Sequence, residues 1–446
     1  MTEFHEGPPT QRPAEATVTR AVVWNQTLWT AGYSLTSGAF LVYFGKELGA
    51  NSFMVALLLV VPETSSTLGL LARWWVRKLG NRKRVWFIFS LGARFVSLGI
   101  PLLVFPSLRP EWIDPLVLLA VLLAVSQAFQ SVAYLSYISW IADLTPEAHW
   151  GRFFSIRNIA KVLVLLVVPV VGGYLRDWWR RDVSAEVAMY AYVVAFGIGI
   201  TLLLCSMIPL IRLPEVITQE AAPVLKKGHL FERAFRDRSM RFLLIHSWWL
   251  SLANGLTQAA FFGYLFGPLG IGLGTLYLLF GVMRLVKLPV SWWTGKLSDE
   301  RGNKWPLFAG VAVASLGMVF WLLAEPERWW WVFGAYVLWG FFAMANIAGR
   351  NLVLKLSPRG DNTVDLGLFR LVGGFLAGIS GLLGGLWLDH LRKTGTSWEL
   401  AGISLGPFQI LFLVSLVGRM TSLIWLFPVQ ESSGSQKNET LHEIRP

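Results

Sequence analysis

A few charged side chains interrupt long apolar stretches of this chain. Glu63, Arg94 and Arg284 each stand near the middle of such a stretch, and Lys287 follows Arg284 by three residues. An ionised side chain in hydrocarbon is costly, which makes these positions candidates for function. Residues three apart lie on one face of a helix, so Arg284 and Lys287 would present two cations together. This pair favours binding of an anionic or carboxylate-bearing solute.

Uncharged polar side chains reach a similar depth in other apolar stretches. Gln127 and Gln130 are three residues apart, and Asn254 and Gln258 are four apart, so each pair shares a helix face. Amide side chains can bind a solute, but they also hydrogen-bond neighbouring helices inside membranes. Both roles stay open for Gln127 and Asn254.

The buried charges have alternative explanations. Glu63 and Arg94 lie at similar depth on consecutive stretches and could neutralise each other; otherwise Glu63, the one acid near mid-depth, is the candidate proton carrier. Arg284 has few acids to pair with, so we expect it to face water or an anion. The acids of the second half fall at helix ends or in connections: Asp365, Asp389 and Glu399.

The composition is typical of a membrane protein. Of 446 residues 54% are hydrophobic and only 15% are charged, against about a quarter in soluble proteins. The net charge of +12 is explained by basic cytoplasmic connections, so no nucleic-acid partner is expected. Cys205 is the only cysteine and the six histidines lack ligand spacing, so we expect neither a metal site nor a cofactor.

Twelve apolar stretches are long enough to span a bilayer, which takes about 20 residues of α-helix. All must be helical, because lipid offers no partner to an open backbone. Lys and Arg concentrate in the connections on the side of the N-terminus, which places both termini in the cytoplasm and the chain in the plasma (inner) membrane. The predicted spans are 18–43, 52–72, 85–105, 115–142, 158–176, 186–211, 242–266, 270–294, 305–324, 329–351, 367–389 and 405–427.

The two halves of the chain repeat each other. Leu144-Thr145-Pro146 follows the fourth span, and Leu356-Ser357-Pro358 follows the tenth. At the same spacing, a double glycine and a following acid in the fifth span, ending at Asp177, match a similar group in the eleventh, ending at Asp389. We therefore predict an all-α membrane protein with two pseudo-symmetric six-helix bundles. The predicted segments are the cytoplasmic tails 1–17 and 428–446, the bundles 18–211 and 242–427, and a cytoplasmic linker 212–241.

The turn after the eighth span carries a family signature. Gly295, Leu297, Asp299, Gly302 and Lys304 fill the pattern Gly-x-Leu-x-Asp-x-x-Gly-x-Lys/Arg between two spanning stretches. In this position the pattern resembles the major facilitator superfamily. The resemblance implies parallel halves that rock about a solute site at mid-membrane.

The resemblance also divides the polar residues by their place in the fold. Spans 1, 4, 7 and 10 of the family line the central cavity, spans 2, 5, 8 and 11 lie beside them, and the others are peripheral. Arg94 and Arg419, on peripheral spans, are then expected to be structural or to reach the membrane surface. The residues that this arrangement places around the site are Glu63, Gln127, Gln130, Asn254, Gln258 and Arg284.

The first copy of the signature turn is altered, because Arg77 stands where the pattern has Asp. In the family that Asp docks at a cytoplasmic helix end and holds the inner side closed. We expect the intact copy to place Asp299 near Arg152 and Arg157. The altered copy would instead join Arg77 to Asp365 at the start of the eleventh span.

The sequence thus predicts a monomeric secondary transporter of a small solute, working by alternating access. Its partners would be the solute, membrane lipids and, if Glu63 carries one, a proton. The alternative is a non-transporting member of the fold that acts as an assembly factor or sensor. An enzyme is not expected, because His246, the only intramembrane histidine, has no evident partner in the sequence.

Overall fold

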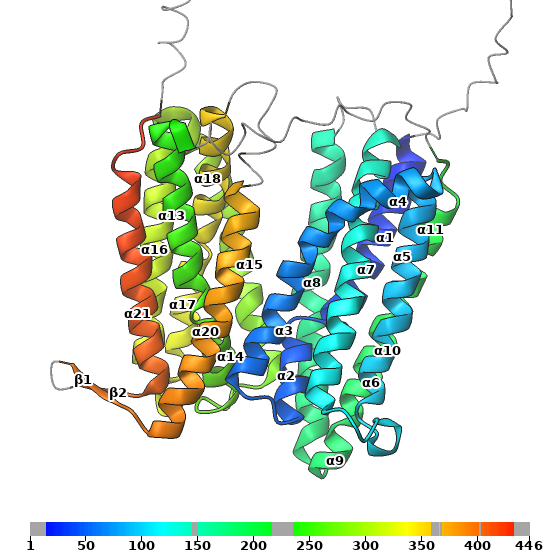
Figure 1. Cartoon of the computed structure of the whole chain (residues 1–446), viewed down its shortest axis with the longest axis horizontal. Coiled ribbons are helices and arrows are strands. Elements are labelled where there is room, and N and C mark those ends of the chain that lie inside the picture. The colour runs from blue at the N-terminus through cyan, green and yellow to red at the C-terminus, as the bar shows by residue number, and fades with distance from the viewer. Residues whose placement is uncertain are drawn as a thin grey trace, which may run out of the picture. The chain divides into compact units, whose positions relative to one another are not determined.

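The computed structural model describes residues 15–144, 150–215, 235–357, 365, 368–400 and 403–431. These are almost entirely helical (Figure 1), which confirms the predicted all-α membrane class. The chain forms two compact units. The first is Met1–Phe40 with Ser65–Pro223, and the second is Leu41–Thr64 with Val224–Pro446.

The first unit is a bundle in which α1 packs against α8 and α10, and α5 packs against α7. A side chain at Gly32 would collide with the backbone of Gly199, so the small residues let α1 and α10 touch. Its elements are α1 (Glu15–Thr36), η1 (Ser66–Leu71), α4 (Ala72–Leu79), α5 (Arg82–Ser97), α6 (Gly99–Leu102), η2 (Pro106–Leu108), α7 (Pro115–Leu144), α8 (Trp150–Arg181), α9 (Ala185–Ala188), α10 (Tyr190–Cys205) and α11 (Ile208–Ile211).

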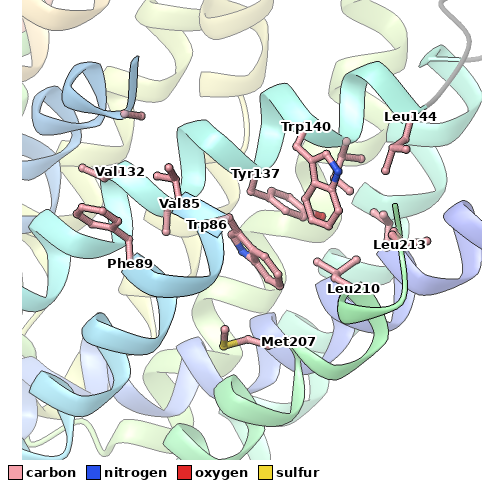
Figure 2. Close-up of a cluster of buried hydrophobic side chains, with 14 of the residues drawn as sticks. Val85, Trp86, Phe89, Val132, Tyr137, Trp140, Leu144, Met207, Leu210 and Leu213 are labelled. Carbon is pink, nitrogen blue, oxygen red and sulfur yellow. The ribbon is translucent and has the colours of Figure 1, made fainter. Parts of the chain in front are cut away.

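An aromatic cluster fills the space between α5, α7 and the end of α11 (Figure 2). The ring centroids of Trp86 and Trp140 are 5.6 Å apart, and Leu210 packs beside them. The Trp140 indole nitrogen donates to the Pro214 carbonyl at 3.0 Å, so burial leaves that polar atom satisfied. The cluster fixes the rotation of α5 and α7, and with it the direction of their polar side chains.

The second unit packs α13 against α20 and α21, and α16 against α17, α18 and α21. Its core includes the stacked rings of Phe261 and Phe412 beside Trp321. Its elements are α2 (Ala39–Glu47), which crosses the boundary, α3 (Ser52–Ser65), α13 (Arg238–Gly255), α14 (Gln258–Phe266), α15 (Leu273–Arg301), α16 (Lys304–Leu323), η4 (Pro326–Arg328), α17 (Trp331–Trp339), α18 (Phe342–Leu356), η5 (Leu368–Val372), α20 (Gly373–Thr394), β1 (Trp398–Leu400), β2 (Ile403–Leu405), α21 (Pro407–Ser422) and η6 (Leu423–Leu426).

Helix α3 belongs to the second unit although its sequence lies in the predicted first bundle. The two carboxylate oxygens of Asp389 accept hydrogen bonds from the backbone amides of Ser52 and Phe53, both at 3.1 Å. An anion at a helix N-terminus satisfies free amides and is favoured by the helix dipole. Asp389 thus holds the start of α3 against α20.

Within the described residues, nine helices are long and apolar enough to cross a membrane. Three predicted spans are not among them. The first is rich in polar residues, the second contains Pro62 and passes into a 3-10 turn, and the seventh breaks between α13 and α14. The count of twelve spans stays a prediction. The nine are 82–102, 115–141, 156–181, 186–211, 273–301, 304–323, 331–356, 368–394 and 407–426.

A short hairpin in the connection before α21 was not predicted. Strands β1 and β2 pair antiparallel, with Trp398 opposite Leu405 and Glu399 opposite Ser404. The residues between the strands lie outside the described part of the chain. The hairpin is the only sheet among the described residues, and the helical class is unchanged.

Candidate functional site

The first unit contains a cavity of about 370 Å³, lined by α1, α5, α7, α8 and the end of α10, which we call the first cavity. Three cations line it, Arg94, Arg157 and Lys161, and no acid is found among the described residues that do so. Its other lining residues are amides, hydroxyls, aromatic rings and one methionine: Asn25, Gln26, Asn158, Gln130, Ser90, Ser206, Trp29, Trp86, Tyr134, Tyr137 and Met207.

Arg94 lies on α5 and is only 5% exposed. One of its terminal nitrogens donates to Gln130 Oε1 at 2.7 Å, while its Nε has no hydrogen-bond partner among the described residues. The partner that positions this guanidinium is a neutral amide, so the bond leaves its charge in place. Arg94 was expected to be structural or to reach the membrane surface; it is buried and lines a cavity.

Arg157 enters the same cavity from α8. Its Nε donates to Gln26 Oε1 at 2.7 Å, and its guanidinium lies 5.4 Å from the centre of the Tyr137 ring. Gln26 is itself fixed, because its amide nitrogen donates to Thr30 Oγ1 at 2.7 Å. The Tyr137 hydroxyl is buried and lacks a partner within the described part of the chain. The lining of the cavity therefore includes two oriented guanidinium groups.

The second unit contains a cavity of about 460 Å³, which we call the second cavity. It lies along one face of α13, with walls from α16, α18, η5 and α20. Arg350 and Arg370 line it and are exposed, whereas His246 is buried. The remaining polar residues that line it are Ser247, Ser251, Asn254 and Asn346.

The predicted site residues are distributed unevenly over these cavities. Gln130 lines the first and Asn254 lines the second. Arg157, predicted to lie near Asp299, also lines the first cavity. The other residues predicted to bind the solute line neither cavity. Arg284 is half-buried on α15, with its guanidinium 5.8 Å from the centre of the Phe280 ring, and Glu63 is exposed on α3. Their binding roles stay predictions. The residues concerned are Glu63, Gln127, Gln258, Arg284 and Lys287.

The signature turn has the expected backbone. Gly302 ends α15 with φ +78°, and Gly80 ends α4 with φ +68°, a region that favours glycine. Asp299 and Arg77 are exposed, and Asp365 is 2% exposed. The side chain of Arg152 lies outside the described residues. The contacts of Asp299 with Arg152 and Arg157, and of Arg77 with Asp365, stay predictions.

Sequence reasoning missed two glutamates that bind at these turns. Glu215 accepts from the backbone amides of Arg82 and Lys83, both at 2.8 Å. Glu431 accepts from the amides of Asn303 and Lys304 at 2.6 and 3.1 Å. Each carboxylate therefore sits at the N-terminus of the helix that follows the turn, where the helix dipole favours it. The available signal was a proline followed closely by Glu after the last span of each half.

Glu431 has additional partners. Lys355 Nζ donates to it at 2.8 Å, and the Asn303 side chain donates at 2.8 Å. Burial by itself would raise the pKa of Glu431, but the hydrogen bonds from Lys355, Asn303 and the two amides together outweigh it and lower that pKa. Glu431 is therefore ionised at neutral pH.

No group of three or more His, Cys, Asp or Glu side chains is placed to hold a metal ion in the residues that the structure describes. The two cavities would therefore interact with a solute through hydrogen bonds and charged side chains. Both can bind a solute.

Comparison with known proteins gives a family and a fold. A family model described as Major Facilitator Superfamily matches residues 24–381. No curated protein matches the sequence. A POT family transporter in complex with 5-aminolevulinic acid is similar at TM-score 0.69 and 12% identity, covering 94% of this chain and 98% of that one. The xylose transporter XylE from E. coli gives 0.64 and 13%, covering 96% and 99%. The nucleoside transporter NupG gives 0.61 and 14%, covering 94% and 99%.

Proposed function

We propose, from the premise that the chain belongs to the major facilitator superfamily, that it carries a small anionic solute across the membrane by alternating access. The observation that carries the anionic preference is the first cavity. There Arg94, Arg157 and Lys161 line one space, and the described lining holds no acid.

The bonds within the first cavity favour an anion over a neutral solute. Arg94 and Arg157 are oriented by the neutral amides of Gln130 and Gln26, so their charges are positioned without being neutralised by those bonds. A carboxylate or phosphate would accept charge-assisted hydrogen bonds from them, which are stronger than bonds between neutral groups. The volume lies in the range of small-molecule sites, about 300–1,000 Å³.

The first cavity also favours transport over the alternative function, that of an assembly factor or sensor. A cavity filled by aromatic side chains would favour an assembly factor or a sensor. The lining of the first cavity includes four aromatic rings, but the cavity retains open volume beside polar and cationic side chains. Transport therefore remains the function that we propose.

Several sequence predictions remain part of this proposal. Glu63 is the proposed proton carrier, and Arg284 with Lys287 is a proposed second cationic pair for the solute. The two-bundle division, the cytoplasmic termini in the plasma membrane and the monomeric state are also proposed. None of these is required for the first cavity to bind an anion.

A binding assay on the purified protein tests the proposal. Ligand binding raises apparent stability by mass action, so thermal shifts can rank a panel of small carboxylates and phosphates against their uncharged amides and alcohols. We expect at least one anion to stabilise the parent more than its neutral counterpart. Arg94→Gln should weaken the binding of that anion by about tenfold to a hundredfold, because it removes a hydrogen bond from a charged group.

The matched control for this variant is Arg419→Gln. Arg419 is 2% exposed and its guanidinium lies 5.8 Å from the centre of the Phe342 ring, but it lines neither cavity. Its replacement also removes a buried guanidinium, yet anion binding should be unchanged. Equal loss of anion binding in both variants, or equal binding of anions and neutral counterparts by the parent, would contradict the proposal.

A further inference from the structure

An apolar groove lies between α8 and α10 of the first unit, and we call it the lateral groove. Both helices pack against α1, and α9 lies between them in the chain, at one end of the unit (Figure 1). The groove has a volume of about 560 Å³. Val171 and Leu175 line it from α8, Val194 and Ile198 line it from α10, and the buried Leu35 of α1 lines it between them.

Small residues keep this space open. Gly172 brings α8 so close to α1 that a Cβ atom there would lie 2.7 Å from Leu35 Cδ2. Ala191 and Ala195 line the groove from α10, where longer side chains would fill it. The larger apolar residues beside them are exposed, with Val194 at 60%. The three helices therefore form an open hollow instead of a closed protein interior.

The lateral groove spans about one leaflet of a bilayer. Its lining on α8 runs from Val167 to Trp179, which is about 18 Å along the helix axis. Half of the hydrocarbon core of a bilayer is about 15 Å thick. Trp178 and Trp179 are exposed at one end of the groove, and tryptophan is enriched where the membrane meets water. The groove therefore begins at a membrane surface, the outer one in the predicted topology, and ends near the bilayer centre.

Hydrocarbon suits this lining better than water does. A water molecule in a cavity needs about two to four polar partners. Among the described residues that line the groove only Arg176 is charged; it is 4% exposed, and its Nη1 lies 2.7 Å from Asp177 Oδ1. Only 11% of the most apolar part of span 156–181 is buried in the protein, the smallest share among the nine candidate spans of the described chain. An acyl chain can cover this face and fill the hollow.

Charged residues of both signs follow the two tryptophans. Arg180 and Arg181 end α8 and are exposed, and the exposed acids Asp182 and Glu186 come next in the chain. Arginines donate charge-assisted hydrogen bonds to a phosphate, and carboxylates accept them from an ammonium group. The mouth of the groove is therefore complementary to a headgroup that carries both charges.

We propose that the lateral groove binds one zwitterionic phospholipid, with an acyl chain between α8 and α10 and its phosphate and ammonium groups at the charged residues beyond Trp179. Inside a membrane, close packing drives association, because lipid chains are as apolar as the protein surface. A chain enclosed by three helices makes more such contacts than one on a flat face. The inference concerns neither solute cavity.

The substitution Ala195→Phe adds a ring where the groove is hollow, and Ala191→Phe is a second filling variant. Gly197→Phe is the matched control. Gly197 lies on the same helix but does not line the groove, and nothing lies within 4 Å of a Cβ atom placed there. The control thus adds the same ring to the exposed surface and leaves the groove open. Thermal unfolding of each variant shows whether it is folded.

Photo-crosslinking in nanodiscs measures the occupancy of the groove by lipid. The full chain is reconstituted with phosphatidylethanolamine that carries a diazirine on one acyl chain, and labelled residues are mapped by mass spectrometry. We expect groove residues of the parent to be labelled about fivefold more than Leu163, which is exposed on α8 outside the groove. Ala195→Phe should lose most of this excess, and Gly197→Phe should keep it. Phosphatidylglycerol with the same chains should label about threefold less, as expected for exposed charge pairs.

Four results would overturn this inference. Groove residues labelled no more than Leu163 would show ordinary boundary lipid. Undiminished labelling in Ala195→Phe, or an equal loss in Gly197→Phe, would show that the label does not report on the groove. Protein–protein crosslinks in place of lipid label would put a second copy of the chain there. Equal labelling by the two headgroups would contradict recognition of both charges. The labelling pattern of the parent is decisive even where a variant fails to fold, and it does not depend on anion binding in the first cavity.

Discussion

The first cavity is lined by oriented hydrogen-bond donors, whereas two residues of the second cavity, His246 and Asn254, each hold a buried acceptor atom without a partner among the described residues. In the first unit, Arg94 and Arg157 are buried or half-buried and held by amide oxygens. In the second, Arg350 and Arg370 are exposed, while His246 and Asn254 provide the buried polar atoms. The two units therefore differ in how their arginines are buried and held beside the cavity.

The turns that join helices in the two units are more alike than the two cavities. In both units a glycine with positive φ ends one helix, and a glutamate binds the amides that start the next. Glu215 and Glu431 fill this role. Because the turn is fixed in the same way in each unit, residues inside the helices can differ without changing the fold.

Charge reversal in the first cavity should have the largest effect. Arg94→Glu replaces a buried donor by an acid next to Gln130 and within the cavity of Arg157. Anion binding should fall by more than about a hundredfold, because an attractive contact becomes repulsive. Undiminished anion binding in titrations of the purified variant would contradict this expectation.

Glu431 caps the N-terminus of α16 with a charged carboxylate, and its removal should lower stability without changing the preference for anions over neutral solutes. Glu431→Gln is expected to cost about 1–2 kcal/mol, because a charged group loses its bonds at a helix N-terminus. Glu215→Gln should cost less, since Glu431 also accepts from Lys355 and the Asn303 side chain. Thermal unfolding of the two variants in the same detergent measures the difference. A larger loss for Glu215→Gln would contradict this order.

The same cap predicts a pH dependence with a defined sign. The folded-state pKa of Glu431 is lowered, so its contribution is complete above the unfolded value of about 4.3 and is lost as the pH falls through the folded value. The parent should therefore lose more stability than Glu431→Gln does as the pH falls below about 4.3 and through the folded-state pKa. Unfolding curves at stepped pH provide the measurement. Identical profiles for the two proteins would argue against an ionised cap.

The smallest effect is expected at the altered signature turn. Arg77→Asp alone should reduce uptake, and adding Asp365→Arg should restore part of it if the two residues form the predicted contact. Asp365 is 2% exposed but Arg77 is exposed to solvent. Ion pairs at a solvated surface contribute only about 0–1 kcal/mol, yet this can shift two conformations of similar energy. A double-mutant cycle on uptake rates tests this prediction. Strictly additive losses would show that Arg77 and Asp365 do not interact.

The sequence predicted the family, the helical class and the glycine turn, because each rests on a local pattern. The sequence was less successful in predicting which polar side chains line the cavities. Gln130 faces the first cavity while Gln127 does not, although they are three residues apart on α7. In a span with apolar residues all round, periodicity does not define the buried face. That face is chosen by packing such as the contact of Gly32 with Gly199, which joins distant segments.

Solute counterflow in proteoliposomes tests the central claim most directly. An anion that stabilises the parent is exchanged across the membrane beside its uncharged amide, for the parent, Arg94→Gln and Arg419→Gln. If the first cavity binds the anion, the parent and Arg419→Gln should exchange it rapidly. Arg94→Gln should exchange it about tenfold or more slowly than the parent. All three proteins should exchange the amide slowly. Equal exchange of anion and amide by the parent, or undiminished exchange of the anion by Arg94→Gln, would contradict the account.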